Sequence, residues 1–293
     1  MQIEVPRGKY ILAVSGGVDS MSLLDILAKK PGIKLIIAHF NHGIRPEAAA
    51  DEDLVQAQAA SYGIVLEPGH GTLGPNASEA TARDARYKFL YKIQKQHKAQ
   101  AVITAHHQDD LIETAFINII RGTGRKGLSS ILSNGQVIRP LLNTSKSEIL
   151  NYARQNKLRW NDDATNEDDR YLRNYLRLKV LPRLSPSQRQ TLISNLDKVA
   201  KNNIKFDKEL ATLSQIINSN NQIDRRLFAA LPSNISNELM AYSLRQAGIV
   251  DFDRKTVSQL STSLKTSKPN TLAPIKQGNY LKLGLKTAWF VTP

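Results

Sequence analysis

Short apolar runs alternate with longer amphipathic stretches over the first hundred residues of the chain. The runs that predict strands are residues 10–14, 35–38, 64–66 and 101–104. The stretches that predict helices are residues 21–30, 46–62 and 78–96. This alternation is typical of a parallel sheet with helices on both faces, an α/β fold whose ligands bind at the carboxyl ends of the strands.

The later sequence changes character at Pro186. From there a long helix is predicted over residues 186–217, where apolar positions recur at alternating four- and three-residue steps and Asn203 interrupts the seam. Short helical patterns and alternating strands after it predict a small α+β domain. We therefore divide the chain into a catalytic domain at residues 1–185, a linking helix at 186–217 and a C-terminal domain at 218–293.

Composition limits the chemistry. A hydrophobic share of 41% suffices for a buried core, and the absence of cysteine excludes disulfides, thiolate metal sites and cysteine nucleophiles. No apolar run approaches the ~20 residues of a membrane span, and the first residues do not resemble a secretory signal. We expect a soluble, cytoplasmic protein that has no membrane partner.

The net charge of +14 is concentrated in the later part of the chain. Residues 1–120 carry 12 basic and 13 acidic side chains, whereas residues 121–293 carry 28 and 13. Clustered lysine and arginine attract phosphate backbones, so this asymmetry favours a polyanion partner for the later region. The alternative is a basic surface that serves only solubility.

The segment Ser15-Gly16-Gly17-Val18-Asp19-Ser20 lies between the first predicted strand and the first predicted helix. Its two glycines allow a tight turn, and its hydroxyls and the N–H groups of the new helix are donors for an anion. It lacks the Walker lysine, and Asp19 is placed to meet a metal ion that bridges phosphates. An ordinary turn with Asp19 or Ser20 as a helix cap is the alternative.

This segment resembles the signature of the PP-loop ATP pyrophosphatases, and further motifs resemble, in order, those of the tRNA(Ile)-lysidine synthetase family. They are residues 39–45 (HFNHGIR), 83–90 (RDARYKFL), 105–114 (AHHQDDLIET), 121–124 (RGTG), 163–166 (DATN) and 171–177 (YLRNYLR). The resemblance covers roughly residues 8–185. It is highly specific, because several unrelated motifs recur in one order.

The resemblance implies a ligase that joins the ε-amine of free L-lysine to C2 of the wobble cytidine in a tRNA(Ile) with a CAU anticodon. ATP adenylates the cytidine oxygen, and lysidine, AMP and pyrophosphate are the products. The cofactors implied are ATP and Mg²⁺, with Asp19 as the metal ligand through the ATP phosphates. The C-terminal domain would then bind tRNA, and a homodimer is one of the assemblies we expect.

Asp110 and Glu113 are the expected lysine-binding pair. Residues three apart share a helix face, and two carboxylates there attract an ammonium group. One of the two acids is also a candidate acceptor for the proton of the attacking amine. An acidic helix start that merely matches the helix dipole is the alternative.

The remaining site residues are assigned through the resemblance. The catalytic residues are Asp19, Arg86, Asp110 and Glu113, with Arg86 facing the charge that develops at the reacting centre. The ATP-binding residues are Ser15, Gly16, Gly17, Val18, Asp19, Ser20, Ala38, His39 and Phe40. The residues that support the active site or the tRNA are His42, Arg45, His106, Arg121, Arg173, Asn174 and Arg177. At helical spacing Arg173 and Arg177 share one face, which suits a phosphate.

Two patterns resemble other sites. Residues 122–127 fit Gly-x-Gly-x-x-Gly, yet a helical run leads into them where a dinucleotide site needs a strand. His106 and His107 are adjacent rather than at the spacing of zinc ligands, so we expect no zinc site.

Three other functions remain as alternatives. One is a different PP-loop tRNA-modifying enzyme, of which the thiolating type is disfavoured because this chain has no cysteine. Amide-forming synthetases share the phosphate loop but not the other motifs. A non-catalytic RNA-binding relative would not need Asp19, Asp110 and Glu113.

Overall fold

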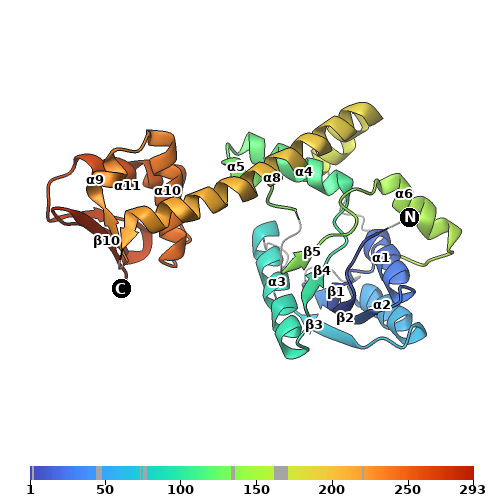
Figure 1. The fold of residues 1–293 in the computed structure, drawn as a ribbon. Coiled ribbons are helices and arrows are strands. Elements are labelled where there is room, and N and C mark those ends of the chain that lie inside the picture. The colour runs from blue at the N-terminus through green and yellow to red at the C-terminus, as the bar shows by residue number, and fades with distance from the viewer. Residues whose placement is uncertain are drawn as a thin grey trace. The chain divides into compact units, whose positions relative to one another are not determined.

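The structure is a computed structural model, and it describes residues 1, 3–43, 48–72, 74, 78–132, 136–161, 171–219 and 221–293. The chain forms two compact units, Met1–Ala200 and Lys201–Pro293. They run from blue to yellow and from orange to red in Figure 1. Arg45 and the motif at residues 163–166 lie outside the described residues. The three-part division of the chain stays a proposal.

The first unit is built on a parallel sheet with the strand order β3-β2-β1-β4-β5. The strands are β1 (Gly8–Ala13), β2 (Ile33–Asn41), β3 (Leu66–His70), β4 (Ala101–Ile103) and β5 (Val137–Ile138). The chain moves outward from β1 through β2 to β3 and then crosses to β4 on the other side of β1. Such a reversal of strand order opens a crevice at the carboxyl ends of β1 and β4, where open α/β sheets bind ligands.

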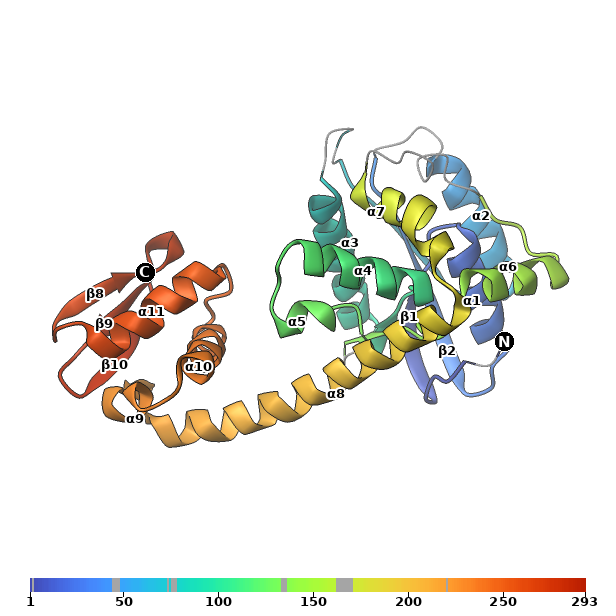
Figure 2. The same ribbon diagram turned by 90° about the horizontal axis from the view of Figure 1, so that it is seen from above.

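Helices cover both faces of this sheet, which confirms the predicted fold class. The helices are α1 (Val18–Ala28), α2 (Ala48–Ser61), α3 (Glu79–Gln96), α4 (Gln108–Ile120), α5 (Arg125–Leu128), α6 (Lys146–Gln155) and α7 (Leu172–Tyr175). Leu12 packs with α1, α2 and α6 in one core, while its neighbour Ile11 packs with α3 in another, because successive strand residues face opposite ways. Figure 2 shows α3 across the sheet from α1, α2 and α6.

Two strand predictions differ from the structure. The third strand begins at Leu66, where the predicted run 64–66 ends, and it continues through Pro68 and Gly69, residues of low strand propensity. It forms because its backbone pairs with the edge of β2. Strand β5 has two residues, too few to leave a periodic pattern.

A π-helical turn (Leu176–Val180) and a 3₁₀ turn (Leu181–Arg183) follow α7, and α8 (Pro186–Ile217) comes next. In the first unit, Ile193 and Leu196 of α8 pack against Leu111 and Ile112 of α4. The later residues Leu210 and Ile217 belong to the core of the second unit. No helix within the described part of the chain is both long and apolar enough to cross a membrane.

The second unit is a small antiparallel sheet packed with helices, which confirms the predicted α+β domain. Its strands are β6 (Asn218–Ser219), β7 (Gln222–Asp224), β8 (Thr271–Pro274), β9 (Tyr280–Leu283) and β10 (Thr287–Val291), in the order β6-β7-β10-β9-β8. Its helices are α9 (Arg225–Ala229), α10 (Ser233–Gln246) and α11 (Arg254–Thr266). Leu281 and Leu283 point into the core beside Phe228 and Leu264, so the alternate residues of β9 face outward.

Asp25 joins three helices of the first unit. Its carboxylate is 2% exposed and accepts hydrogen bonds from Tyr62, which follows α2, from Tyr152 of α6 at 2.6 Å and from Lys29 at 2.8 Å. Burial raises the pKa of Asp25, but the bonds from Lys29 and the two tyrosines outweigh it, so the pKa lies below its usual value. Burial and the bond to Asp25 raise the pKa of Tyr62 to about 12. This cluster fixes α6 against α1.

Replacement of Tyr152 by Phe removes one donor from a buried carboxylate. We expect the free energy of unfolding in urea to fall by about 1–3 kcal/mol. The matched variant Tyr91→Phe, on a side chain that is 37% exposed, changes it by less than ~0.5 kcal/mol. Equal effects of the two substitutions would show that the Asp25 cluster does not stabilise this packing.

Candidate active site at the ends of β1 and β4

The glycine loop at residues 15–20 turns the chain from β1 into α1. Gly16 has φ +89°, a conformation in which other residues are strained, and a Cβ there would lie 3.3 Å from Cβ of Asp51. Ser20 Oγ accepts a hydrogen bond from the N–H of Ser15 at 3.1 Å and donates to the carbonyl of Gly17 at 2.9 Å. The two serine hydroxyls lie 3.2 Å apart. The expected phosphate loop is therefore a closed turn held by its own serines.

Helix α1 begins without a side-chain cap. Gly17 is its N-cap, and within the described residues no side chain accepts from the N–H groups of the first turn at this cap. An uncapped helix start leaves these donors and the positive end of the helix dipole for an anion.

Asn161 and Asp51 contact the glycine loop from two distant parts of the sequence. The N–H of Asn161 donates to the carbonyl of Gly16 at 3.1 Å. Its Nδ2 donates to Oδ1 of Asp51 at 2.9 Å. Neither residue was predicted from the sequence, because nothing in a motif indicates a contact over 110 positions.

His107 connects the glycine loop to the acids of α4. It is 4% exposed, and its Nδ1 accepts from the N–H of Asp109 at 3.2 Å, while Asp110 Oδ2 accepts from the N–H of His107 at 2.9 Å. Because Nδ1 is an acceptor, the neutral ring carries its proton on Nε2. That atom lies 3.8 Å from a carboxylate oxygen of Asp19 and 3.6 Å from Oδ2 of Asp110. Asp19 of the loop and Asp110 of α4 therefore meet at one imidazole.

The predicted acid pair faces an arginine of the same chain. Glu113 is fully buried, and Arg177 Nε and Nη2 donate to its two oxygens at 2.8 and 3.0 Å. Nη2 of Arg177 also lies 3.3 Å from Oδ1 of Asp110, and Nη1 of Arg173 lies 3.6 Å from Glu113. The two arginines share one face, as expected, and that face meets carboxylates. Asn174 is half-buried between them on α7.

The pKa values of the two acids shift in opposite directions. Burial raises the pKa of Asp110, but the nearby His107 and His106 and the hydrogen bond from His107 outweigh it, so the pKa falls below its usual value. Burial raises the pKa of Glu113 even though Arg177 opposes the shift. Of the pair, Asp110 is held as the anion and Glu113 is the more basic.

His106 lies among arginines. Its Nδ1 is 2.8 Å from the hydroxyl of Thr104. Burial, then the charges of Arg139, Arg86 and Arg83, outweigh the attraction of Asp110 and lower the pKa of His106 to about 3. The predicted Arg86 thus lies close enough to His106 to lower its pKa. Its guanidinium also lies 5.9 Å from the ring centre of Tyr87.

Arg139 is a site residue that the motifs did not indicate. It follows β5, is 6% exposed, and donates to the hydroxyl of Tyr87 at 3.1 Å and to the carbonyl of Leu132 at 3.0 Å. The sequence carried no signal for it, because the two-residue edge strand before it leaves no periodic pattern.

The end of β2 lies against the start of the glycine loop. His39 is buried, and its Nδ1 donates to the carbonyl of Val14 at 2.9 Å, while the N–H of Val14 donates to the carbonyl of Ala38 at 3.0 Å. Phe40 stacks near Phe89 with ring centres 5.2 Å apart, and the ring of His42 meets it edge-on at 4.9 Å. The ATP-binding residues expected at the end of β2 thus adjoin the expected phosphate loop.

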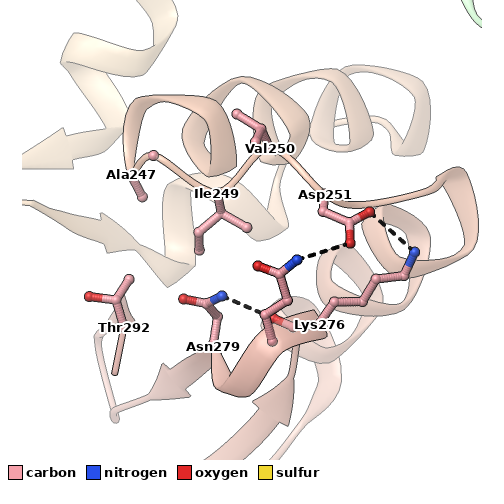
Figure 3. A pocket seen from close by; sticks show the side chains of 9 residues that line it. Ala247, Ile249, Val250, Asp251, Lys276, Asn279 and Thr292 are labelled. Atoms are coloured by element: carbon pink, nitrogen blue, oxygen red, sulfur yellow. Dashed lines mark hydrogen bonds and ion pairs between the residues drawn. The ribbon is translucent and has the colours of Figure 1, made fainter. Parts of the chain in front are cut away.

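Other features lie away from this centre. Arg121 caps the carboxyl end of α4, about 16 Å along the helix from Asp110. Helix α4 runs into residues 122–127, as predicted, so they lack the strand that a dinucleotide site requires. A cavity of about 150 Å³ in the second unit is lined by none of the predicted site residues (Figure 3). Its Asp251 lies 3.5 Å from Nζ of Lys276.

The glycine loop carries a single carboxylate, that of Asp19. Within the described residues there is no group of three His, Asp or Glu side chains that could hold an ion. Mg²⁺ commonly uses one or two carboxylates together with substrate phosphates. Asp19 fits Mg²⁺ in that way, as a partner of a bound triphosphate.

A family model of the PP-loop domain matches residues 2–184. This chain belongs to the PP-loop family. The glycine loop, the parallel sheet and the site at the ends of β1 and β4 all lie within the matched part.

Several curated relatives of this PP-loop chain are tRNA(Ile)-lysidine synthases. The protein of Thermus thermophilus is 37% identical over 186 residues, which cover 61% of this chain and 36% of the relative. That of Lactobacillus johnsonii is 35% identical over 245 residues, which cover 80% and 53%. This chain thus spans about half the length of such relatives or less.

A solved structure shares the PP-loop fold. It is the U34-tRNA thiolase NcsA from Methanococcus maripaludis with its [4Fe-4S] cluster, with a TM-score of 0.55 and 19% identity. The match covers 67% of this chain and 74% of that one. At this identity the likeness supports the fold alone.

The low pKa of His106 predicts a dependence of stability on pH. Unfolded histidine has a pKa near 6.5, so the folded state binds fewer protons and loses stability as pH falls from about 6.5 toward about 3. We expect His106→Asn to remove roughly 1–2 kcal/mol of the loss between pH 7 and pH 5, measured by urea unfolding. The exposed-site variant His70→Asn should keep the wild-type profile. An unchanged profile in His106→Asn would contradict the assigned environment.

Proposed function

We propose that this protein joins free L-lysine to C2 of the wobble cytidine of a tRNA(Ile) with a CAU anticodon, consuming ATP and releasing AMP and pyrophosphate. The observation that carries the proposal is the bridge through His107, whose Nε2 lies within 3.8 Å of Asp19 and 3.6 Å of Asp110. A phosphate-binding loop and an amine-binding acid are thereby neighbours. The names of the relatives support tRNA(Ile) as the RNA substrate.

In the first step, the cytidine O2 attacks the α-phosphorus of ATP, an O–P bond forms and pyrophosphate leaves. The uncapped N–H groups of α1 bind the phosphates, and Arg86 stabilises the negative charge that develops. Asp19 would hold Mg²⁺, which supplies positive charge to the triphosphate. The cytidine oxygen, a poor leaving group, becomes part of AMP.

In the second step, the ε-amine of lysine attacks C2, the C2–O bond breaks and AMP leaves. The proton lost by the amine needs an acceptor near the acid pair. Asp110 and Glu113 are the two candidate acceptors.

The contacts of Arg177 indicate which of the two acids, Asp110 or Glu113, would bind the ammonium group of lysine. Its contacts with Glu113, at 2.8 and 3.0 Å, are shorter than its contact with Asp110 at 3.3 Å. Glu113 is also the more deeply buried of the two, so loss of its partner would cost more. We therefore assign the lysine ammonium to Asp110 while Glu113 keeps Arg177.

The tRNA is assigned to the basic C-terminal part. Residues 254–293 contain seven lysines and arginines and no aspartate or glutamate. On the outward face of β9 and β10, Lys282 pairs across the strands with Trp289, its Nζ lying 5.5 Å from the ring centre, and exposed Tyr280 pairs with Val291. Lysine beside aromatic rings suits a phosphate backbone with unstacked bases. A cytoplasmic location and a homodimer belong to the same proposal.

The direct test is incubation of the purified protein with an unmodified tRNA(Ile) bearing a CAU anticodon, ATP and radiolabelled lysine. We expect label in the tRNA that depends on ATP. Without label, continued ATP–pyrophosphate exchange with tRNA would favour a different PP-loop tRNA-modifying enzyme. Loss of exchange as well, with tRNA binding retained, would favour a non-catalytic RNA-binding relative.

Two variants separate the two steps. Asp19→Asn should lower ATP–pyrophosphate exchange at least 100-fold, because the carboxylate that would hold Mg²⁺ at the phosphates is lost. Asp110→Asn should leave exchange within about threefold and raise KM for lysine by about 10-fold or more. Loss of both steps to the same extent in both variants would contradict this division.

The RNA surface is tested by Lys282→Gln. Removal of one phosphate contact should weaken tRNA binding and reduce the slope of log K against log salt by about 0.7–0.9. The control Lys205→Gln changes a lysine that is 79% exposed and lies 4.0 Å from Glu209. An unchanged slope in Lys282→Gln, or the same change in both variants, would remove this face from the tRNA site.

A further inference from the structure

Lys146 lies on the carboxylate of the glycine loop. Its Nζ donates to both oxygens of Asp19, at 2.7 and 2.8 Å, although the two residues are 127 positions apart. The loop itself carries no lysine. A lysine is nevertheless delivered to it by the first residue of α6.

The fold holds α6 in register with α1. Ser145 caps α6: its N–H donates to Glu148 at 2.8 Å, and its Oγ accepts from the N–H of Glu148 at 3.3 Å. Six residues after Lys146, Tyr152 donates to Asp25, which is six residues after Asp19 on α1. Because the spacing is equal on the two helices, the buried contact between Tyr152 and Asp25 also sets the position of Lys146 against Asp19.

The ion pair itself adds little stability. The side chains of Lys146 and Asp19 are 37% and 28% exposed, and exposed pairs typically contribute less than ~1 kcal/mol. The pair lies instead at the uncapped start of α1, in the crevice where this fold binds ligands. An ammonium group there meets the same anions as the N–H groups of the helix start.

We propose that Lys146 is a phosphate-binding residue that changes partner when nucleotide binds. Without nucleotide it neutralises Asp19. When a metal-bound triphosphate occupies the loop, Asp19 takes the cation and Nζ of Lys146 donates to an oxygen of the β- or γ-phosphate. Lys146 then has the role of the lysine that the loop lacks. The proposal rests on the use of ATP proposed above.

Binding measurements test it without turnover. In Lys146→Gln we expect the affinity for ATP, with saturating Mg²⁺, to fall about 10- to 100-fold in calorimetry, the loss of one charge-assisted hydrogen bond. Affinity for AMP, which lacks the β- and γ-phosphates, should stay within twofold. Lys146→Arg should restore most of the ATP affinity, and Lys34→Gln, an exposed lysine at the start of β2, should match wild type.

Equal loss of ATP and AMP affinity in Lys146→Gln, or an unchanged ATP affinity, would each overturn the proposal. If wild-type protein binds no ATP, the proposed function itself fails.

Discussion

The carboxylate of Asp19 is the constraint on which the site depends. It projects from the first turn of α1, where the helix start has no side-chain cap, and it is met by Lys146 from α6 and His107 from the start of α4. Three segments separated in sequence are thus fixed around one negative charge. Because open α/β sheets bind ligands at the carboxyl ends of the strands where the strand order reverses, this charge stands where a ligand of the sheet would lie.

Around that carboxylate, negatively and positively charged side chains alternate. Asp110 and Glu113 follow His107 on α4, and Arg173 and Arg177 from the segment after residue 170 cover them. The lysine proposed as substrate would therefore enter a site that already holds cations, and it would bind by exchange with them rather than by filling an empty acidic pocket. The π-helical turn that carries Arg177 is a geometry often found at functional sites, and its backbone departs from the regular helix at that point.

Local patterns in the sequence account for much of this arrangement. The glycine loop and the pair at Asp110 and Glu113 were predictable, because a turn and a shared helix face depend on residues close together in the chain. Lys146, Asp51 and Asn161 were not, since each reaches the loop from more than 30 positions away and only the folded sheet brings it there. Arg177 was expected to face a phosphate. The spacing predicted its helix face correctly but carried no information on the charge of the group that this face meets.

The central claim is that the glycine loop binds the triphosphate of ATP. Its most direct test is a crystal structure of the protein with Mg²⁺ and an ATP analogue that cannot be cleaved between the α- and β-phosphates. The account predicts the β- and γ-phosphates within hydrogen-bonding distance of the N–H groups of residues 17–20, with the metal on Asp19. A nucleotide bound elsewhere, with residues 15–20 making no contact to phosphate, would contradict it.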